Sequence, residues 1–338
     1  MTSPESLILG RLLEAKDRFV TGNELAQLLG VSRVTVWKHM KKLRRDGFSF
    51  EAVRKRGYRI RETPGCVSLP YLHCLLPEVS KDRLIFLERT GSTNSDAERL
   101  LGEGRTAPFV VLTRLQTQGR GRLGRSWHSG DPGNLYASFA FRPQVPPERM
   151  QLFTLWMGVS LCRCIEQETG VTPGVKWPND IWYGDRKMGG ILTEAKVNAD
   201  RILELVLGLG LNINSDPSSW PDPLSRGATS LRLAGNGTLD INALSAAVIG
   251  RLLEAYQAFL EDAYRPTLAE LWETYDILRN REVAGQRGNE VLSGRARGID
   301  GSGHLLVECG NGGVVRLNAG DVTLRGAGSP DEPRAASP

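Results

Sequence analysis

Residues 116–127 read Gln-Thr-Gln-Gly-Arg-Gly-Arg-Leu-Gly-Arg-Ser-Trp, and glycines 119, 121 and 124 have the Gly-x-Gly-x-x-Gly spacing of a dinucleotide-binding turn. That fold requires a helix directly after the turn, because the helix N-terminus binds the pyrophosphate. Here the next segment contains Asp131-Pro132-Gly133, which does not begin a helix. The chain also lacks a Gly-x-x-x-x-Gly-Lys-[Ser/Thr] phosphate loop. The sequence therefore excludes both common nucleotide-binding motifs and leaves an arginine loop of another kind.

This loop has three arginines, Arg120, Arg122 and Arg125, and residues 104–130 include no Asp or Glu. Backbone N–H groups and guanidinium groups together bind anions. A reaction that joins a carboxylate to a nucleoside triphosphate needs such cations, because its reactants repel each other and negative charge builds on the α-phosphate. The alternative interpretation is a loop that binds RNA or phosphate without specificity.

A second motif reads Lys176-Trp177-Pro178-Asn179-Asp180-Ile181, and Asp185-Arg186-Lys187-Met188-Gly189-Gly190 follows it closely. Pro178 predicts an extended turn, which places Asn179 and Asp180 at the start of a strand, where they are able to hold ATP, a metal or an amine. The two glycines after Lys187 allow a ligand to approach the backbone closely. On composition alone, Asp180 is equally well explained as a turn residue and Lys187 as a surface lysine.

The N-terminal segment is typical of a helix-turn-helix. Leucines and an isoleucine near helical spacing predict a first helix within residues 5–18, and Thr21-Gly22-Asn23-Glu24 predicts a capping box at the start of a second. Gly30-Val31 breaks the chain and Ser32 caps a third helix. The buried face of that third helix is predicted to consist of Val34, Trp37, Met40 and Leu43.

Positive charge is concentrated in the same region. Residues 33–61 hold eleven Lys or Arg against two acidic residues, whereas the whole chain has a net charge of +5. Strands 48–53 and 58–61 are predicted to form a hairpin wing around a basic turn at residues 54–57. The segment is thus expected to bind DNA, against the alternative of a solvated basic face on an interaction module. The predicted DNA contacts are Arg33, Thr35, Lys38, His39, Lys42, Arg45, Arg54, Lys55 and Arg56.

The rest of the chain divides into further predicted parts. Strand and helix patterns mix from residue 84 to 262, which indicates an α+β or α/β middle domain. Short β runs between glycine turns follow from Glu282 and predict a small β-barrel. The expected division is 1–63 for the DNA-binding domain, 66–278 for the catalytic domain, 280–326 for the barrel and 327–338 for a disordered tail.

Five cysteines in odd number and without CxxC spacing are interpreted as reduced structural thiols. The pair Cys162 and Cys164 is the one alternative metal or redox site, but it lies in an amphipathic pattern that favours core packing. No stretch of the sequence matches a signal peptide or an obvious membrane span. A cytoplasmic protein with no membrane partner is therefore expected.

Several motifs occur together along the chain: Gly91-Ser92-Thr93-Asn94, GRGRLGRSW from Gly119, GNLY from Gly133, KWPND from Lys176, DRKMGGIL from Asp185 and GLGLNIN from Gly208. In their order and spacing they resemble the bacterial biotin-protein ligases, in particular the bifunctional group that is also a biotin-operon repressor. The chain to about residue 326 resembles this group. The resemblance implies a central domain similar to the class II synthetase-like biotin/lipoate ligases, between a winged helix-turn-helix and an SH3-like β-barrel.

The resemblance also implies site residues. Biotin is expected to contact Ser92, Thr93, Asn94, Gln116, Arg120, Gly121, Arg122, Lys187, Gly208 and Gly210. Uncharged hydrogen-bonding groups suit the neutral ureido ring of biotin, and glycines admit a ring against a strand. The ATP side is expected to use Arg122, Trp127, Asn179, Asp180 and Asn212, with Trp220 of the 215–226 segment as the possible adenine-stacking ring.

The expected mechanism has two half-reactions. The biotin carboxylate attacks the ATP α-phosphate with Mg²⁺ assistance, and a lysine of biotin carboxyl carrier protein then attacks the biotinoyl-AMP. Arg120, Arg122 and Lys187 would stabilise charge, and Asp180 would orient the reactants or accept the lysine proton. Expected partners are that carrier protein, biotin operator DNA and a ligand-dependent homodimer. The rival functions are a lipoate-type acyl-adenylating ligase and a ligand-sensing regulator without turnover.

Overall fold

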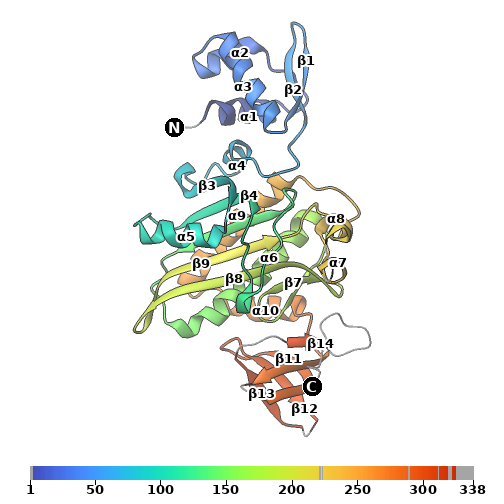
Figure 1. Ribbon diagram of the computed structural model, residues 1–338. Helices are drawn as coiled ribbons and strands as arrows, with labels where there is room; N and C mark the ends of the chain where they lie inside the picture. Colours follow the sequence, from blue (N-terminus) through green and yellow to red (C-terminus); the bar gives the residue numbers. More distant parts are fainter. Residues whose placement is uncertain are drawn as a thin grey trace.

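The computed structural model describes residues 3–220, 222, 224–287, 290–310, 312–318 and 322–324. Figure 1 shows three parts in chain order: a small helical domain with a hairpin, a large central domain and a C-terminal β module. The predicted disordered tail at 327–338 lies outside the described residues. The predicted α+β multidomain architecture is confirmed.

The N-terminal domain consists of α1 (Pro4–Glu14), α2 (Gly22–Leu29), α3 (Arg33–Arg45) and the hairpin of β1 (Ser49–Val53) and β2 (Gly57–Glu62). The predicted capping box is present, because Thr21 Oγ1 accepts from Glu24 N while Glu24 Oε1 accepts from Thr21 N. Gly30 ends α2 with φ 65°, a left-handed value that glycine adopts without strain. Ser32 Oγ then accepts from Thr35 N and caps α3, as predicted.

The predicted buried face of α3 is partly wrong. Met40 and Leu43 are fully buried, but Val34 is 65% exposed and Trp37 is 50% exposed. Val36 takes the remaining core position, so the buried residues follow i, i+4, i+7 spacing. The sequence pattern misled because two apolar residues stand on the outer face of a helix that is otherwise basic.

The central domain is built on a seven-stranded sheet in the order β3-β4-β5-β9-β8-β7-β6. Only β3 and β4 are parallel, and every other neighbouring pair is antiparallel. The strands are β3 (Leu84–Thr90), β4 (Phe109–Gln116), β5 (Leu135–Phe141), β6 (Gly174–Lys176), β7 (Asp180–Tyr183), β8 (Arg186–Asn198) and β9 (Arg201–Leu211).

Helices cover both faces of this sheet (Figure 1). On β4, Val110 and Leu112 join the large core beneath α6 (Met150–Thr169) and α9 (Ile241–Leu260), whereas Phe109 and Val111 pack with α5 (Thr93–Gly102) on the other face. Helices α4 (Leu69–Leu75), α7 (Leu224–Gly227), α8 (Leu231–Ala234) and α10 (Arg265–Tyr275) complete the domain. Short 3₁₀ turns occur at Lys81–Arg83, Arg122–Gly124, Pro147–Arg149 and Pro217–Ser219.

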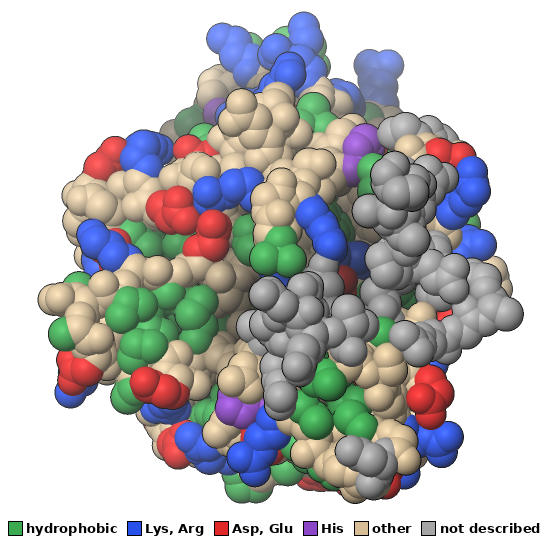
Figure 2. Space-filling view, turned by 60° about the horizontal axis from the view of Figure 1, so that its bottom comes forward, with side chains coloured by type: hydrophobic (Ala, Val, Ile, Leu, Met, Phe, Trp, Pro, Cys, Tyr) green, Lys and Arg blue, Asp and Glu red, His purple; other side chains and the backbone are tan. Residues whose placement is uncertain are grey.

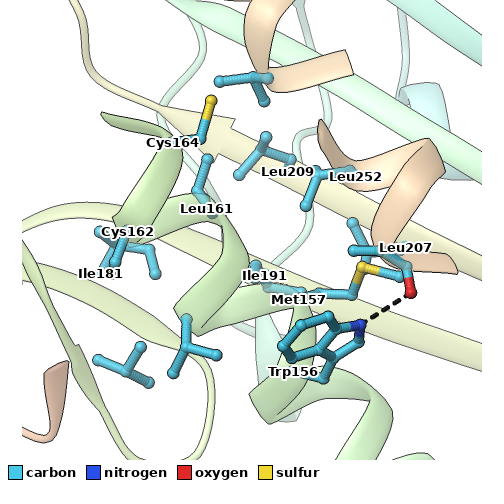
Figure 3. Packing of buried hydrophobic residues seen from close by; sticks show 14 of the residues in the cluster. Trp156, Met157, Leu161, Cys162, Cys164, Ile181, Ile191, Leu207, Leu209 and Leu252 are labelled. Carbon is cyan, nitrogen blue, oxygen red and sulfur yellow. Dashed lines mark hydrogen bonds between the residues drawn. The ribbon is translucent and has the colours of Figure 1, made fainter. Parts of the chain in front are cut away.

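The two neighbouring cysteines belong to the core, as predicted. Figure 3 shows Cys162 and Cys164 on α6 among apolar side chains of β8, β9 and α9. Both thiols are buried and free, and no group of three or more His, Cys, Asp or Glu able to hold a metal occurs among the described residues. Burial raises the pKa of the Cys164 thiol to about 11, which disfavours the reactive thiolate.

Helix α9 is long and apolar enough to cross a membrane by length and composition. Its residues Val248, Ile249 and Leu252 are nevertheless fully buried in the core of the central domain, and Trp156 of α6 donates to its Ala255 O at 2.8 Å. Core helices of soluble proteins meet the same criterion, so this helix is weak evidence for a membrane span.

The C-terminal module is a five-stranded antiparallel sheet in the order β13-β12-β11-β10-β14. Its strands are β10 (Glu282–Arg287), β11 (Glu290–Ile299), β12 (Leu305–Cys309), β13 (Val314–Leu317) and β14 (Val322–Leu324). The turn between β11 and β12 docks on the central domain, where Gly303 O accepts from Trp177 Nε1 at 3.0 Å. The predicted strand-rich C-terminal domain is confirmed.

Candidate active site and nucleic-acid interface

A buried network of uncharged polar groups lies where β4, β5 and the start of α5 meet. Gln116 Oε1 accepts from Thr93 N at 2.9 Å, and Gln116 Nε2 donates to Ser129 Oγ at 2.9 Å. Ser138 Oγ lies 2.7 Å from Thr93 Oγ1 and 2.6 Å from Asn94 Oδ1. Thr93, Asn94 and Gln116, three of the residues predicted to contact biotin, are therefore brought together.

The arginine loop lies beside this network and forms a compact hairpin. Gly121 N donates to Arg125 O at 2.7 Å and Trp127 N donates to Gly119 O at 2.8 Å. No helix follows the loop, and the next regular element along the chain is β5, which begins at Leu135. Together with Leu192 and Glu194 of β8, residues 120–125 line a cleft of about 420 Å³. The volume of this cleft falls within the usual range for small-molecule sites.

The second motif forms the turn between β6 and β7, as Pro178 predicts, and Asp180 begins β7. Asn179 joins this turn to the arginine loop, since its Oδ1 accepts from Arg122 Nη1 at 2.9 Å. The carboxylate of Asp180 pairs with Lys187, with 2.7 Å between Oδ1 and Nζ. Asn179 and Asp180 thus connect two cations of different loops, Arg122 and Lys187, at the start of β7.

Glycines leave the space that these side chains occupy. A Cβ on Gly210 would overlap the Trp127 ring, and one on Gly208 would overlap the Asn94 amide. A Cβ on Gly190 would contact Lys187, Trp127 and Asp180. Trp127, Lys187 and Asp180 thus lie over the backbone of Gly190. Only glycine fits at position 210, beneath the Trp127 ring, and at position 208, beneath the Asn94 amide.

Two buried polar atoms at the predicted nucleotide side have no hydrogen-bond partner among the described residues: Trp127 Nε1 and Asn212 Oδ1. An unpaired buried polar atom costs about 1–3 kcal/mol, which a ligand can recover by bonding to it. The Asn212 amide nitrogen is already used, since it donates to Thr229 O at 3.0 Å. Trp220, the predicted adenine-stacking ring, packs against His128 with 4.8 Å between centroids.

Sequence reasoning missed three residues of this site. Glu194 accepts from both Asn94 Nδ2 and Arg120 Nη2, Glu98 accepts from the same Arg120 nitrogen, and Ser138 connects Thr93 with Asn94. No local pattern marks them, because each is an ordinary residue of a helix or strand. Only the alternation of β8, which turns Glu194 toward the site, was open to prediction.

The N-terminal domain presents a basic face. Figure 2 shows Lys and Arg side chains crowded at the end of the molecule that bears this domain. Seven of the nine predicted DNA contacts are exposed: Arg33, Lys38, Lys42, Arg45, Arg54, Lys55 and Arg56. His39 and Thr35 are less accessible, because His39 Nδ1 lies 2.9 Å from Glu5 Oε1 and Thr35 bonds to the capping Ser32.

Comparison with known proteins explains this combination of domains and site. Residues 86–212 match the model of the biotin/lipoate A/B protein ligase family, residues 5–59 match an HTH domain, and residues 280–325 match the biotin protein ligase C-terminal domain. The matches follow the same order as the three parts of the fold. The chain belongs to the biotin/lipoate A/B protein ligase family.

Among its relatives, the chain is similar over its length to two bifunctional ligase/repressors named BirA. That of Bacillus subtilis is 34% identical, covering 92% of this chain and 95% of the relative. That of Escherichia coli is 30% identical, covering 93% and 96%. A solved structure of the biotin protein ligase of Aquifex aeolicus, in complex with biotin and ATP, superposes with a TM-score of 0.61 at 27% identity, covering 72% of this chain and 98% of that one.

Proposed function

We propose that this chain is a biotin-protein ligase that forms biotinoyl-AMP from biotin and ATP, transfers biotin to a lysine of biotin carboxyl carrier protein, and represses the biotin operon through its N-terminal domain. The observation that carries the catalytic part is the arginine loop over a cleft next to Lys187 and Asp180. The BirA relatives, described as both ligase and repressor, support the two roles together.

The uncharged network would hold the biotin ring system. Ser92, Thr93, Asn94 and Gln116 offer both donors and acceptors, as a neutral ureido group requires. Gly208 and Gly210 serve this network indirectly, because they leave the space against β9 that Asn94 and Trp127 occupy. The biotin carboxylate would then lie toward Gly121, Arg120, Arg122 and Lys187. These side chains would offset the repulsion between the carboxylate and the triphosphate and stabilise charge on the α-phosphate.

The nucleotide would lie on the side of Trp127, Asn179, Asp180 and Asn212. The unpartnered Trp127 Nε1 and Asn212 Oδ1 supply one donor and one acceptor for it. Mg²⁺ would be held mainly by the phosphates of ATP, with at most one carboxylate such as Asp180, since the described residues offer no cluster of metal ligands. When bound, Mg²⁺ neutralises phosphate charge. Trp220 is the proposed ring over the adenine.

In the second half-reaction, the ε-amine of the carrier lysine attacks the acyl carbon of the mixed anhydride. An amide bond forms, the acyl–phosphate bond breaks, and AMP leaves with the electron pair. Asp180 is close enough to the cations to orient this step, and after release from Lys187 its carboxylate would accept the amine proton.

The test is biotinylation of purified carrier protein in the presence of ATP, with lipoate as the competing acid. We expect transfer of biotin, and no transfer of lipoate at equal concentration. Preferred transfer of lipoate would favour the lipoate-type ligase, and ligand binding without any transfer would favour a sensing regulator.

For the N-terminal domain, we propose operator DNA as the partner, with the exposed cations of α3 and the wing on phosphates and base edges. Binding of promoter DNA should weaken steeply as salt rises, because several phosphates are neutralised. A gel shift without retardation even at low salt would contradict this part. We further propose a cytoplasmic protein, which the five free cysteines support.

A further inference from the structure

One cation of the arginine loop is held by two carboxylates from different elements. Arg120 Nη2 lies 2.8 Å from Glu194 Oε2 on β8 and 3.2 Å from Glu98 Oε1 on α5. The three side chains are partly exposed, at 38% for Arg120, 32% for Glu194 and 43% for Glu98. A loop residue is therefore tied to a helix and to a central strand at the same time.

Glu194 is itself fixed in place. Its Oε2 accepts from Asn94 Nδ2 at 2.6 Å, and Asn94 is only 4% exposed. The other atom of that amide, Oδ1, lies 2.6 Å from the buried Ser138 Oγ. Asn94 has no freedom to shift toward β9, because it fills the space above Gly208. The carboxylate that holds Arg120 is thus a rigid anchor on the wall of the cleft.

The arginine loop is also braced by hydrogen bonds of its own. Its backbone is bonded internally between Gly121 and Arg125 and between Gly119 and Trp127. Two residues beyond Arg120, Arg122 donates to Asn179 Oδ1 at 2.9 Å. The Arg120 contacts are thus ionic, whereas the Asn179 oxygen that accepts from Arg122 is neutral.

The positive charge of Arg120 offsets the repulsion between Glu98 and Glu194. Burial and the charge of Glu194 raise the pKa of Glu98, whereas Arg120 lowers it. If Arg120 leaves, two carboxylates remain close together without their cation, which is unfavourable. Opening of the loop on this side consequently separates an ion pair and leaves two like charges facing each other.

We propose that Glu98 and Glu194 are positioning residues that act through Arg120: their ion pairs hold residues 119–127 over the cleft and slow the escape of the activated acyl-adenylate. The inference rests on the proposed function, because it needs an adenylate to be retained. Retention matters chemically, since a free mixed anhydride is lost to water or to unintended amines.

The experiment measures release of preformed biotinoyl-AMP from the full-length protein, using radiolabelled adenylate and a chase of unlabelled adenylate, for wild type, Glu98→Gln and the double variant Glu98→Gln with Glu194→Gln. Glutamine keeps an acceptor but removes the charge. We expect release roughly threefold faster for the single variant and roughly tenfold faster for the double variant, the range that partly exposed ion pairs allow. Salt should speed release from wild type and have much less effect on the double variant.

The matched control is Glu103→Gln at the C-cap of the same helix, because Glu103 pairs with Arg99 of that helix at 2.7 Å. It should release adenylate at the wild-type rate. Glutamine variants that release the adenylate at the wild-type rate would overturn the inference while leaving the proposed function intact. A wild-type release rate that does not depend on salt would do the same. A merely structural role would lower the melting temperature and leave the salt dependence in place. A wild type that forms no adenylate would instead overturn the proposed function, and this inference with it.

Discussion

At the scale of single residues, the site consists of charges that are paired before any ligand arrives. Lys187 pairs with Asp180, Arg120 with Glu98 and Glu194, and Arg122 Nη1 donates to Asn179. Anionic substrates must compete with these protein partners. The chemistry of the cations was predictable from the GRGRLGR and KWPND motifs. The carboxylates that pair with Arg120 could not be predicted, because Glu98 and Glu194 lie on other elements and no local sequence pattern marks them.

Asp180→Asn tests the role proposed for this carboxylate. The variant keeps the size of the side chain but loses the proton acceptor, so transfer of biotin to the carrier lysine should slow about 10²-fold, the lower end for a general base. Single-turnover transfer from preformed adenylate measures this step. The control is Asp185→Asn, since the Asp185 side chain is 75% exposed and pairs with Arg281 of the segment before the C-terminal module. Equal rates for wild type and Asp180→Asn would remove the role.

At the scale of elements, capping residues and helix periodicity predicted α1, α2 and α3 within a few residues. Prediction failed where the pattern was ambiguous. Strand β5 is buried on both faces and so shows no alternation. On α3, the apolar Val34 and Trp37 were assigned to the core although they face outward.

The corrected face of α3 predicts opposite effects for two neighbouring substitutions. Trp37→Ala should weaken DNA binding severalfold with little change in melting temperature, because the ring is half exposed beside Lys41. Met40→Ala should destabilise the domain by about 2–5 kcal/mol, because it empties a fully buried position. Thermal unfolding and gel shifts on both variants measure this. A large loss of stability in Trp37→Ala would reinstate the original assignment.

Asp276 at the end of α10 predicts a pH dependence of stability. Burial raises its pKa to about 6, although Leu278 N and Trp272 Nε1 donate to it. A folded-state pKa above the unfolded value means that the folded protein binds the extra proton, so stability falls as pH rises toward 6. From pH 7 to pH 5, wild type should gain about 1 kcal/mol relative to Asp276→Asn. Denaturant unfolding at both pH values checks the sign, and a constant difference would contradict it.

At the scale of the whole molecule, the sequence predicted three parts because each has its own local signature. The contacts between the three parts could not be predicted from the sequence. Tyr71 of α4 packs against Phe48 in the core of the N-terminal domain, and its hydroxyl donates to Asp240 at the start of α9. Trp177 of the KWPND motif similarly reaches the C-terminal module. The contacts of Tyr71 with Asp240 and of Trp177 with Gly303 join segments more than 100 residues apart, which pattern reasoning does not pair.

Assembly is a second property of the whole molecule. If loop closure over the adenylate also orders a dimer surface, the protein should be monomeric alone and dimeric with biotin and MgATP. Light scattering should show the mass rise about twofold on adding both ligands, with biotin or ATP alone as controls. A mass that does not depend on ligands would separate catalysis from repression.

The central claim, that the arginine loop activates biotin with ATP, is tested most directly by biotin-dependent exchange between ATP and pyrophosphate. Purified wild type is compared with Arg122→Ala, which removes the guanidinium that bonds to Asn179 beside the cleft. The account predicts exchange that requires biotin and falls by at least 10²-fold in the variant, as expected when a charge-stabilising donor is lost. Well-folded wild type that binds biotin but shows no exchange, or a variant that exchanges at the wild-type rate, would contradict it.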